Sequence, residues 1–185
     1  MKSLWLETKL DYDGTQLRPL YSYMNHRLDG PSVLGFRGAC HVDFAHMIDG
    51  EDLREQSAIA GSDMVHLIVE FFHANLLSAV ALQRLIASLA ATTVEDLSGG
   101  KVRLRREGDD LYLDDAKFSI SIATVSAVSQ LVHFAVNVSQ KGTPVKTCAL
   151  EDWGLNPEVF GRTLIAKVAF EFDSMWAATE KVRPV

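Results

Sequence analysis

Hydrophobic and polar positions repeat with a helical period in three stretches of the first half of the chain. Residues 16–27 carry apolar side chains at helical spacing, with Pro19 in the first turn, and predict an amphipathic helix. The most apolar stretch of helical length, 62–79, predicts a second helix, and 81–91 predicts a third. The apolar stripe of the first helix must face a sheet or another helix.

A period of two, typical of strands, marks other parts of the chain. Residues 4–8 alternate as a short strand, and 32–44 predict two extended segments pinched at Gly35 and Gly38. From residue 102 the same alternation predicts a run of four antiparallel strands, at 102–104, 111–113, 118–123 and 130–139.

The last element is a long helix, with Asn156 as its cap and Pro157 at its first position. Helices and strands therefore occur in separate runs rather than in strict alternation. This order predicts an α+β fold, with a mostly antiparallel sheet packed against helices.

Length and composition are those of one folded domain spanning residues 1–185. Of the 185 residues 48% are hydrophobic, which is enough to build a core without disulfides or a structural metal. The formal charge of −6 argues against a DNA or RNA partner, because nucleic-acid binding needs a cationic surface. Lys101, Arg103 and Arg105 share one face of a predicted strand, which indicates a solvated face rather than a nucleic-acid site.

The sequence also predicts a cytoplasmic protein that does not span a membrane. The first residues lack the uninterrupted apolar core of an export signal, and the apolar stretch 64–80 is broken by histidine, glutamate and asparagine. Cys40 and Cys148 are too few for a disulfide framework, as expected in a reducing compartment.

The first candidate site is a charged hairpin over 106–112, followed by Lys117 and by the strand residues 133–137. A hairpin with the carboxylate pair Asp109 and Asp110 and one returning lysine is able to hold magnesium and a phosphate together. The alternative interpretation is a solvated hairpin with a charged turn, and the pattern alone favours this alternative.

The second candidate is a metal site on the predicted helix 62–79. His66, Glu70 and His73 follow at i, i+4 and i+7, which places two imidazoles and a carboxylate on one helical face, as in a metal-dependent hydrolase. The alternative is a buried polar stripe whose histidines bond to neighbouring backbone or side chains, and it is the favoured interpretation.

The third candidate is a polar segment that forms a wall of a ligand cleft. Its members are Cys40, His41, Asp43 and His46, followed by Asp49, Glu51 and Asp52. Adjacent residues of a strand face opposite sides, so Cys40 and His41 are poor partners for nucleophilic catalysis. Arg37 is the group best suited to meet a carboxylate or phosphate with two hydrogen bonds. An ordinary surface loop with ion pairs is an equal alternative.

The run GDDLYLDDAKFSISIATVSAVSQLVHFAVNV resembles the catalytic-lysine region of the biotin and lipoate protein ligases. Asp109-Asp110-Leu111 stands for their Asn-Asp-Ile segment, Lys117-Phe118-Ser119 for the lysine segment, and Asn137-Val138 for the Asn-Val that ends the next strand. The resemblance covers about thirty-five residues at the level of motifs.

A wider resemblance extends over nearly the whole chain. The segments GFRGAC, HMIDGEDL, MVHLIVEFF, QRL, GDDLY, KFSISIAT and GTPV are similar to those of a family filed as domain of unknown function 366. That family is archaeal and bacterial and has no established activity. The resemblance implies the fold of the biotin and lipoate ligase catalytic domain, in which the sheet is mixed and mostly antiparallel.

The ligase resemblance implies ATP and magnesium as cofactors and a small carboxylic acid as the second ligand. Lys117 would contact the acid's carboxylate and the α-phosphate while an acyl-adenylate forms, and Asp109 or Asp110 would hold magnesium. Asn137 matches the ligases' asparagine, and Arg37-Gly38 loosely matches the Arg-Gly-Gly loop of the lipoate ligases.

Two departures from the ligases favour an alternative function. Ile120 stands where the ligases have glycine, and a branched side chain there narrows the pocket. The Gly-Arg-Gly-Arg loop of the biotin ligases does not occur in the sequence. Both departures speak for a non-catalytic small-molecule binder of the same fold and against acyl transfer to a carrier protein. The apolar strands and the last helix also permit a homodimer.

Overall fold

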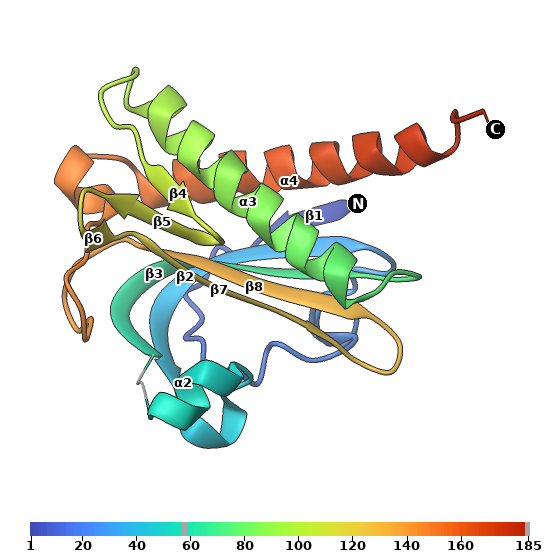
Figure 1. Cartoon of the computed structure of the whole chain (residues 1–185), viewed down its shortest axis with the longest axis horizontal. Helices are drawn as coiled ribbons and strands as arrows, with labels where there is room; N and C mark the ends of the chain where they lie inside the picture. The colour runs from blue at the N-terminus through green and yellow to red at the C-terminus, as the bar shows by residue number, and fades with distance from the viewer. Residues whose placement is uncertain (57–58, 184–185) are drawn as a thin grey trace.

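The computed structural model describes residues 1–56 and 59–183, and its central element is a mixed five-stranded sheet with strand order β1-β2-β3-β8-β7 (Figure 1). The strands are β1 (Lys2–Trp5), β2 (Ser32–Val42), β3 (Ile59–Phe71), β7 (Ser119–Val125) and β8 (Gln130–Asn137). β1 and β2 are parallel, whereas the other neighbours in this sheet are antiparallel. The predicted α+β class with a mostly antiparallel sheet is confirmed.

Two long helices cover one face of this sheet, and short elements lie on the other face (Figure 1). The long helices are α3 (Leu76–Leu97) and α4 (Pro157–Thr179), and the short helices are α1 (Tyr21–His26) and α2 (Gly50–Glu55). The 3-10 turns are η1 (Phe44–His46) and η2 (Leu150–Trp153). A second, three-stranded sheet at one end consists of β4 (Arg105–Glu107), β5 (Asp110–Leu113) and β6 (Ala116–Lys117).

Strand alternation divides the buried side chains into two cores. Along β3, Val65 and Leu67 belong to the core under α3 and α4. Met64 and Ile68 belong to the second core, on the opposite face, together with residues such as Tyr12 from the N-terminal segment. Side chains on successive residues of a strand point to opposite faces, so β3 is apolar on both. His66 lies on the second face, because it is two residues from both Met64 and Ile68.

The predicted helix over 62–79 is wrong, because most of this stretch is β3. A strand buried on both faces has a continuous apolar sequence, and such a sequence does not distinguish a strand from a buried helix. The next helix, α3, begins at Leu76, where the Asn75 side chain accepts a hydrogen bond from the Ser78 N–H at 2.9 Å. The predicted helix 81–91 is therefore confirmed, with longer bounds.

The strand predicted over 102–104 is wrong, because these residues form no strand and β4 begins at Arg105, whereas the other predicted elements are found with shifted bounds. The helix over 16–27 shortens to α1, because Leu20 adopts a left-handed conformation with φ of 61° directly before it. The two segments over 32–44 form one strand, β2, with a register shift between Gly38 and Cys40. The predicted cap of the last helix is confirmed, since Asn156 accepts hydrogen bonds from the first turn of α4.

Among residues 1–56 and 59–183, one helix, α3, is long and apolar enough to cross a membrane by length and composition alone. A core helix of a folded domain passes the same test. One face of α3 is buried, with Leu82, Ile86 and Ala90 in the core that it shares with α4.

Candidate functional site

An open cleft of about 440 Å³ lies where α2 approaches the ends of β6, β7 and β8. Ligand sites of this size are common for small molecules. Four of the residues predicted from the ligase resemblance line this cleft, namely Asp109, Asp110, Lys117 and Asn137. The structure thus brings together groups that the sequence spreads over 29 positions, and Ile120 lines the same cleft.

Lys117 is held by backbone hydrogen bonds on both of its sides. Its N–H donates to the Lys146 carbonyl at 3.0 Å, and its carbonyl accepts from the Asn137 amide at 3.2 Å. The same Asn137 amide donates to the Cys148 carbonyl at 3.2 Å, which ties the end of β8 to the 143–148 segment. Asn137 therefore acts on the cleft by fixing the backbone of Lys117.

The Lys117 ammonium forms an ion pair with Asp110. Its Nζ lies 2.8 Å from Asp110 Oδ2, and the two side chains are 30% and 26% exposed. Both groups are on the small sheet, where Tyr112 of β5 pairs with Lys117 of β6. An ion pair of this exposure is readily exchanged for a ligand, because it contributes only about 1 kcal/mol or less.

Asp109 is anchored from the neighbouring elements. One of its oxygens, Oδ2, accepts hydrogen bonds from Gln83 of α3 at 2.8 Å and from Ser121 of β7 at 2.7 Å. These two neutral donors fix the carboxylate without neutralising its charge. Gln83 and Ser121 were missed by the sequence analysis, because neither residue is close to Asp109 in the chain.

Negative charge dominates the cleft. In the part of its wall that the structure describes, one cation, Lys117, faces six carboxylates: Asp49, Glu51, Asp52, Glu55, Asp109 and Asp110. Burial raises the pKa of Asp52, and the neighbouring Asp49 carboxylate raises it further, while Lys117 opposes the shift. Such a wall repels a free polyanion and attracts a divalent cation.

The residues present fit magnesium in its usual protein setting. Mg²⁺ is commonly bound through one or two carboxylates together with substrate phosphates, and Asp109 and Asp110 supply that number. No group of three or more metal-ligating side chains was found within residues 1–56 and 59–183, so an all-protein metal cage is not formed there.

The structure places part of the predicted polar wall around open space, with His46 beside a smaller cavity and Glu51 in the cleft. Asp49 and Asp52 line the cleft, and Asp49 caps α2 by accepting from the Glu51 N–H at 2.8 Å. His41 and Asp43 instead form an exposed pair, 3.3 Å apart. Cys40 is buried, and burial raises the pKa of its thiol to about 12, so it is not a nucleophile at neutral pH.

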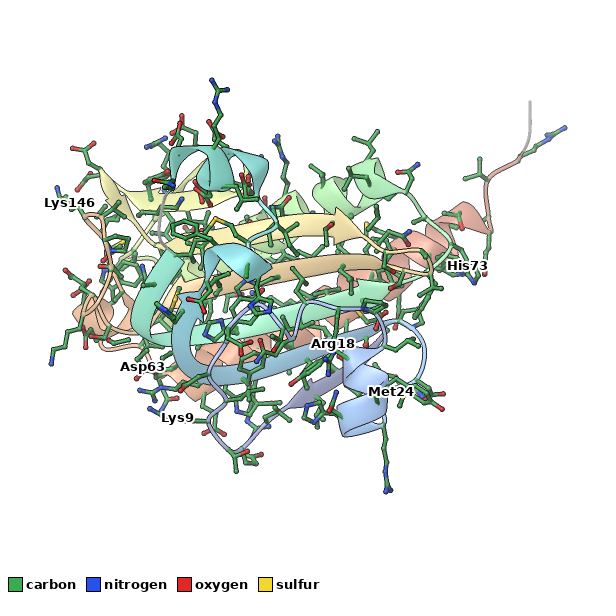
Figure 2. All side chains as sticks on the ribbon, turned by 90° about the horizontal axis from the view of Figure 1, so that it is seen from below. Lys9, Arg18, Met24, Asp63, His73 and Lys146 are labelled. Atoms are coloured by element: carbon green, nitrogen blue, oxygen red, sulfur yellow. The ribbon has the colours of Figure 1, made fainter. Side chains whose placement is uncertain are left out.

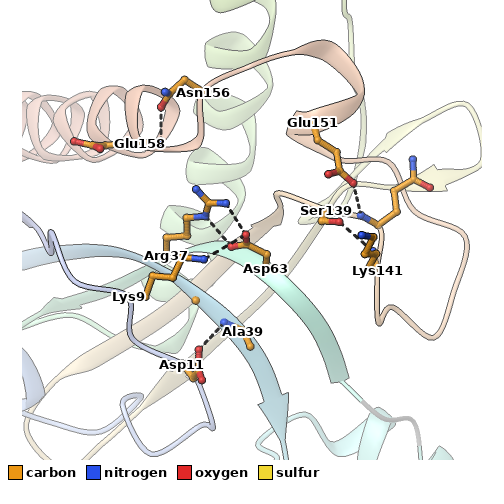
Figure 3. Close-up of polar contacts among 12 residues, drawn as sticks. Lys9, Asp11, Arg37, Ala39, Asp63, Ser139, Lys141, Glu151, Asn156 and Glu158 are labelled. Carbon is orange, nitrogen blue, oxygen red and sulfur yellow. Dashed lines mark hydrogen bonds and ion pairs between the residues drawn. The ribbon is translucent and has the colours of Figure 1, made fainter.

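Arg37 does not face the cleft, contrary to the sequence-based prediction. Arg37 and Gly35 are two residues apart on β2, so they face the same side of the sheet. This side is covered by α4, because a Cβ added at Gly35 would lie 2.9 Å from Ile165 of α4. The Arg37 guanidinium binds Asp63 with two hydrogen bonds of 2.8 and 2.5 Å, and Lys9 lies 3.6 Å from the same carboxylate (Figure 3).

Gly38 is also explained by packing rather than by phosphate binding. A Cβ at this position would lie 2.0 Å from the carbonyl oxygen of Leu10. The N-terminal segment crosses the sheet here, and Asp11 accepts a hydrogen bond from the Ala39 N–H at 2.8 Å (Figure 3). Glycine is needed at Gly38 because the backbone of another segment occupies the side-chain position.

The predicted metal set of His66, Glu70 and His73 is not brought together. His66 bonds to His133 and to the Gly38 carbonyl, whereas Glu70 accepts from the Leu20 N–H and the Ser129 hydroxyl. His73 follows the end of β3 and lies at the opposite end of the molecule from Asp63 (Figure 2). The three residues share a face only on a helix, and this stretch is a strand.

A smaller cavity of about 50 Å³ adjoins the cleft and was not predicted. Tyr12 and His133 line it, and Asp52 and Ile120 line both cavities. Tyr12 stacks on His133 with ring centroids 3.8 Å apart. Tyr12 and His133 are too far apart in the sequence for their contact to be predicted. The one sequence feature that points to this cavity is a single histidine in the apolar strand β8.

Comparisons with known proteins agree on the family and the fold. A family model described as "Domain of unknown function (DUF366)" matches residues 1–183. An uncharacterised protein of Methanocaldococcus jannaschii is 30% identical over 192 aligned positions, which cover 100% of this chain and 86% of that protein. A solved structure, a protein of unknown function from Pyrococcus horikoshi, is 37% identical with a TM-score of 0.95 and covers 100% and 98% of the two chains.

More distant structures share the fold at low sequence identity. The biotin protein ligase from Aquifex aeolicus in complex with biotin and ATP has a TM-score of 0.60 and 12% identity, covering 91% of this chain and 68% of that one. A T. acidophilum protein named as a candidate lipoate protein ligase, with lipoic acid bound, has a TM-score of 0.59 and 10% identity, covering 90% and 83%. The expected ligase-like fold is confirmed.

Proposed function

We propose that the chain, which belongs to the DUF366 family, binds a magnesium complex of an adenine nucleotide and a small carboxylic acid in the cleft at Lys117. The observation that carries this proposal is the position of Lys117, whose backbone is held by hydrogen bonds, in a cleft of about 440 Å³ whose other charged groups in the described part of its wall are carboxylates. The distant structures of the same fold include a biotin ligase with biotin and ATP and a protein with lipoic acid, which supports these two ligand classes.

Lys117 would neutralise the acid's carboxylate and the α-phosphate when they meet. A carboxylate oxygen then attacks the α-phosphorus, the bond from phosphorus to the bridging oxygen breaks, and pyrophosphate leaves with that electron pair. A fixed ammonium favours this step, because negative charge shifts on the phosphate oxygens in the transition state. Anchoring of the Lys117 carbonyl by Asn137 keeps the backbone of Lys117 in place as the ligands enter.

Asp109 and Asp110 would hold magnesium, which would neutralise the phosphates in this negative cleft. For Asp110 this role requires release from Lys117, since the two now form an ion pair. Ligand entry is thus an exchange in which Lys117 gains an anionic ligand and Asp110 gains a cation. The exchange keeps both charges paired throughout.

A second function, non-catalytic binding, is favoured by one observation. Ile120 lines the cleft next to Asn137 and Lys117, at the position where the ligases have glycine. A branched side chain in the cleft is compatible with holding a small molecule but reduces the room for two ligands in reacting contact. A binder of this kind would use Lys117 as a ligand contact only.

Pyrophosphate exchange into ATP, measured with biotin, lipoate, octanoate and shorter acids, tests the proposal. We expect exchange that depends on one acid and is lost in Lys117→Ala. The matched control is Lys167→Ala, because Lys167 has the same 30% exposure and its Nζ pairs with Asp96 at 2.7 Å. Absence of exchange with every acid, although an acid and ATP still bind, would leave the non-catalytic function.

Three further predictions accompany this function. Transfer of an acyl group to a carrier protein is not expected. A homodimer is permitted, because α4 exposes apolar residues such as Phe170 and Trp176. The expected location is the cytoplasm.

A further inference from the structure

A chain of buried hydrogen bonds determines which nitrogens of two histidines carry protons. His66 Nε2 lies 3.3 Å from the Gly38 carbonyl, and its Nδ1 lies 3.1 Å from His133 Nε2. A carbonyl oxygen only accepts, so His66 must be protonated on Nε2. Burial lowers the pKa of His66 to about 4, so its ring is neutral at pH 7 and Nδ1 is an acceptor.

The same reasoning extends to the second ring. His133 Nε2 must donate to His66 Nδ1, so His133 carries its proton on Nε2. Burial, followed by the proximity of His66, lowers the pKa of His133 well below its usual value. His133 is therefore neutral at pH 7, and its Nδ1 presents an unprotonated lone pair.

Nothing in residues 1–56 and 59–183 donates a hydrogen bond to His133 Nδ1, although the residue is only 3% exposed. In that part of the chain the fully enclosed side-chain atoms without a partner are Ser22 Oγ, His26 Nε2 and Ser32 Oγ. His133 Nδ1 is not one of these fully enclosed atoms, and His133 lines a cavity. The space beside the ring is the cavity of about 50 Å³.

This small cavity shares part of its wall with the cleft. Asp52, Ile59 and Ile120 line both cavities, so the two spaces adjoin. His133 precedes Asn137 by four residues on β8, which places the two about 13 Å apart along the strand. The wall near His133 is mixed: Ile120 and Ile122 of the neighbouring strand and the Tyr12 ring supply its apolar part, and Asp52 and Ser121 supply polar groups.

We propose that His133 Nδ1 determines specificity by accepting a hydrogen bond from an N–H or O–H group at the far end of the bound acid. The ligand class is an acid with an apolar body, whose carboxylate lies at Lys117 and whose other end carries a hydrogen-bond donor. The proposal rests on the proposed function for the carboxylate end. A buried acceptor without a partner penalises ligands that lack the donor, since its lost hydration is not replaced.

Two probes that differ only at the far end test the proposal. Octanoate and 8-hydroxyoctanoate are titrated calorimetrically into the native protein, into His133→Phe and into His133→Gln. The phenylalanine variant removes both the acceptor and the donor, whereas the glutamine amide supplies a donor for His66 and an acceptor for the ligand. We expect the native protein to prefer 8-hydroxyoctanoate by at least about fivefold, His133→Phe to lose the preference, and His133→Gln to retain it.

The outcomes separate this inference from the proposed function. Equal binding of both probes to the native protein, with loss of binding in Lys117→Ala, would overturn the role of His133 and leave the carboxylate site intact. The role of His133 would also be overturned if His133→Phe still preferred 8-hydroxyoctanoate to octanoate. Binding of neither probe would overturn the carboxylate site and this inference together. Thermal unfolding of both variants shows whether each remains folded.

Discussion

Lys117 Nζ lies 2.8 Å from Asp110 Oδ2, so the one cation in the described wall of the cleft already has an anionic partner. Under the proposed function, an acid that binds to Lys117 competes with Asp110 for the ammonium, and a carboxylate released from Lys117 is free to hold a cation. The proposal therefore couples acid binding and magnesium binding through this ion pair. Substitution of Asp110 separates the two effects.

Asp110→Asn is expected to change the two ligands in opposite directions. The acid alone should bind up to about fivefold more tightly, because Lys117 no longer has a competing carboxylate. Magnesium-ATP should bind more weakly, because one of the two expected magnesium ligands is lost. Calorimetric titration with each ligand measures both effects.

Asp96→Asn is the control, because Asp96 pairs with Lys167 on the helical layer, away from the cleft. The free energy of unfolding should change by less than about 1 kcal/mol in both variants, since both ion pairs are partly exposed. Equal effects of Asp110→Asn on the acid and on magnesium-ATP would contradict the coupling.

Gly38→Ala is expected to destabilise the fold by at least about 2 kcal/mol. The new methyl group would lie 2.0 Å from the Leu10 carbonyl oxygen, and backbone atoms cannot give way as the tip of a side chain does. Gly50→Ala is the control: an added Cβ at the start of α2 would meet no atom within 4 Å, so the free energy of unfolding should stay level or rise slightly. Urea unfolding measures both variants, and equal stabilities would contradict this packing.

The buried histidine pair predicts a loss of stability between pH 6.5 and pH 4. In the unfolded chain both histidines titrate near 6.5, whereas burial lowers the pKa of His66 to about 4 and that of His133 well below its usual value. The unfolded chain therefore binds protons that the folded protein excludes, and acidification favours unfolding. The free energy of unfolding should fall by up to roughly 1.4 kcal/mol per pH unit for each histidine.

Urea titrations at pH 7, 6 and 5 measure this slope. His66→Gln removes one titrating group, so its slope should be smaller than that of the native protein. If the free energy of unfolding of the native protein were constant from pH 7 to pH 5, the two buried rings would be protonated as readily as in the unfolded chain. That result would contradict the lowered pKa values.

The main error of the sequence analysis concerns β3. The sequence from Met64 to Phe71 is apolar at nearly every position, because β3 is covered by helices on one face and by the N-terminal segment on the other. Residues four apart share a face in both a helix and a strand, so the spacing of His66 and Glu70 did not distinguish the two. The position of His73 does distinguish a helix from a strand. Seven residues separate it from His66, so the two share a face in a helix but not in an extended strand.

The hairpin part of the site was predictable, and the long-range part was not. Asp109, Asp110 and Lys117 lie within nine positions of one another, so alternation and the ligase motif were enough to group them. The contact of His66 with His133 spans 67 positions and depends on the pairing of β3 with β8. Arg37 was misplaced because the side of β2 that faces α4 is set by packing, which one sequence does not reveal.

Arg37→Ala tests this revised position. It should lower the free energy of unfolding by about 1 kcal/mol, because Asp63 loses its two hydrogen bonds from the guanidinium and keeps only Lys9 nearby. Affinity for the acid and for magnesium-ATP should stay within about twofold of the native value, measured by calorimetry. A loss of affinity in the folded variant would return Arg37 to the site.

The measurement that tests the central claim most directly is the affinity of the native protein, Lys117→Ala and Lys167→Ala for magnesium-ATP and for the acid panel. We predict that Lys117→Ala weakens binding by at least about tenfold, since it removes a charged contact to both ligands, while Lys167→Ala binds as the native protein does. Equal affinities of the native protein and Lys117→Ala for every ligand would contradict the account, because the cleft at Lys117 would then not be the ligand site.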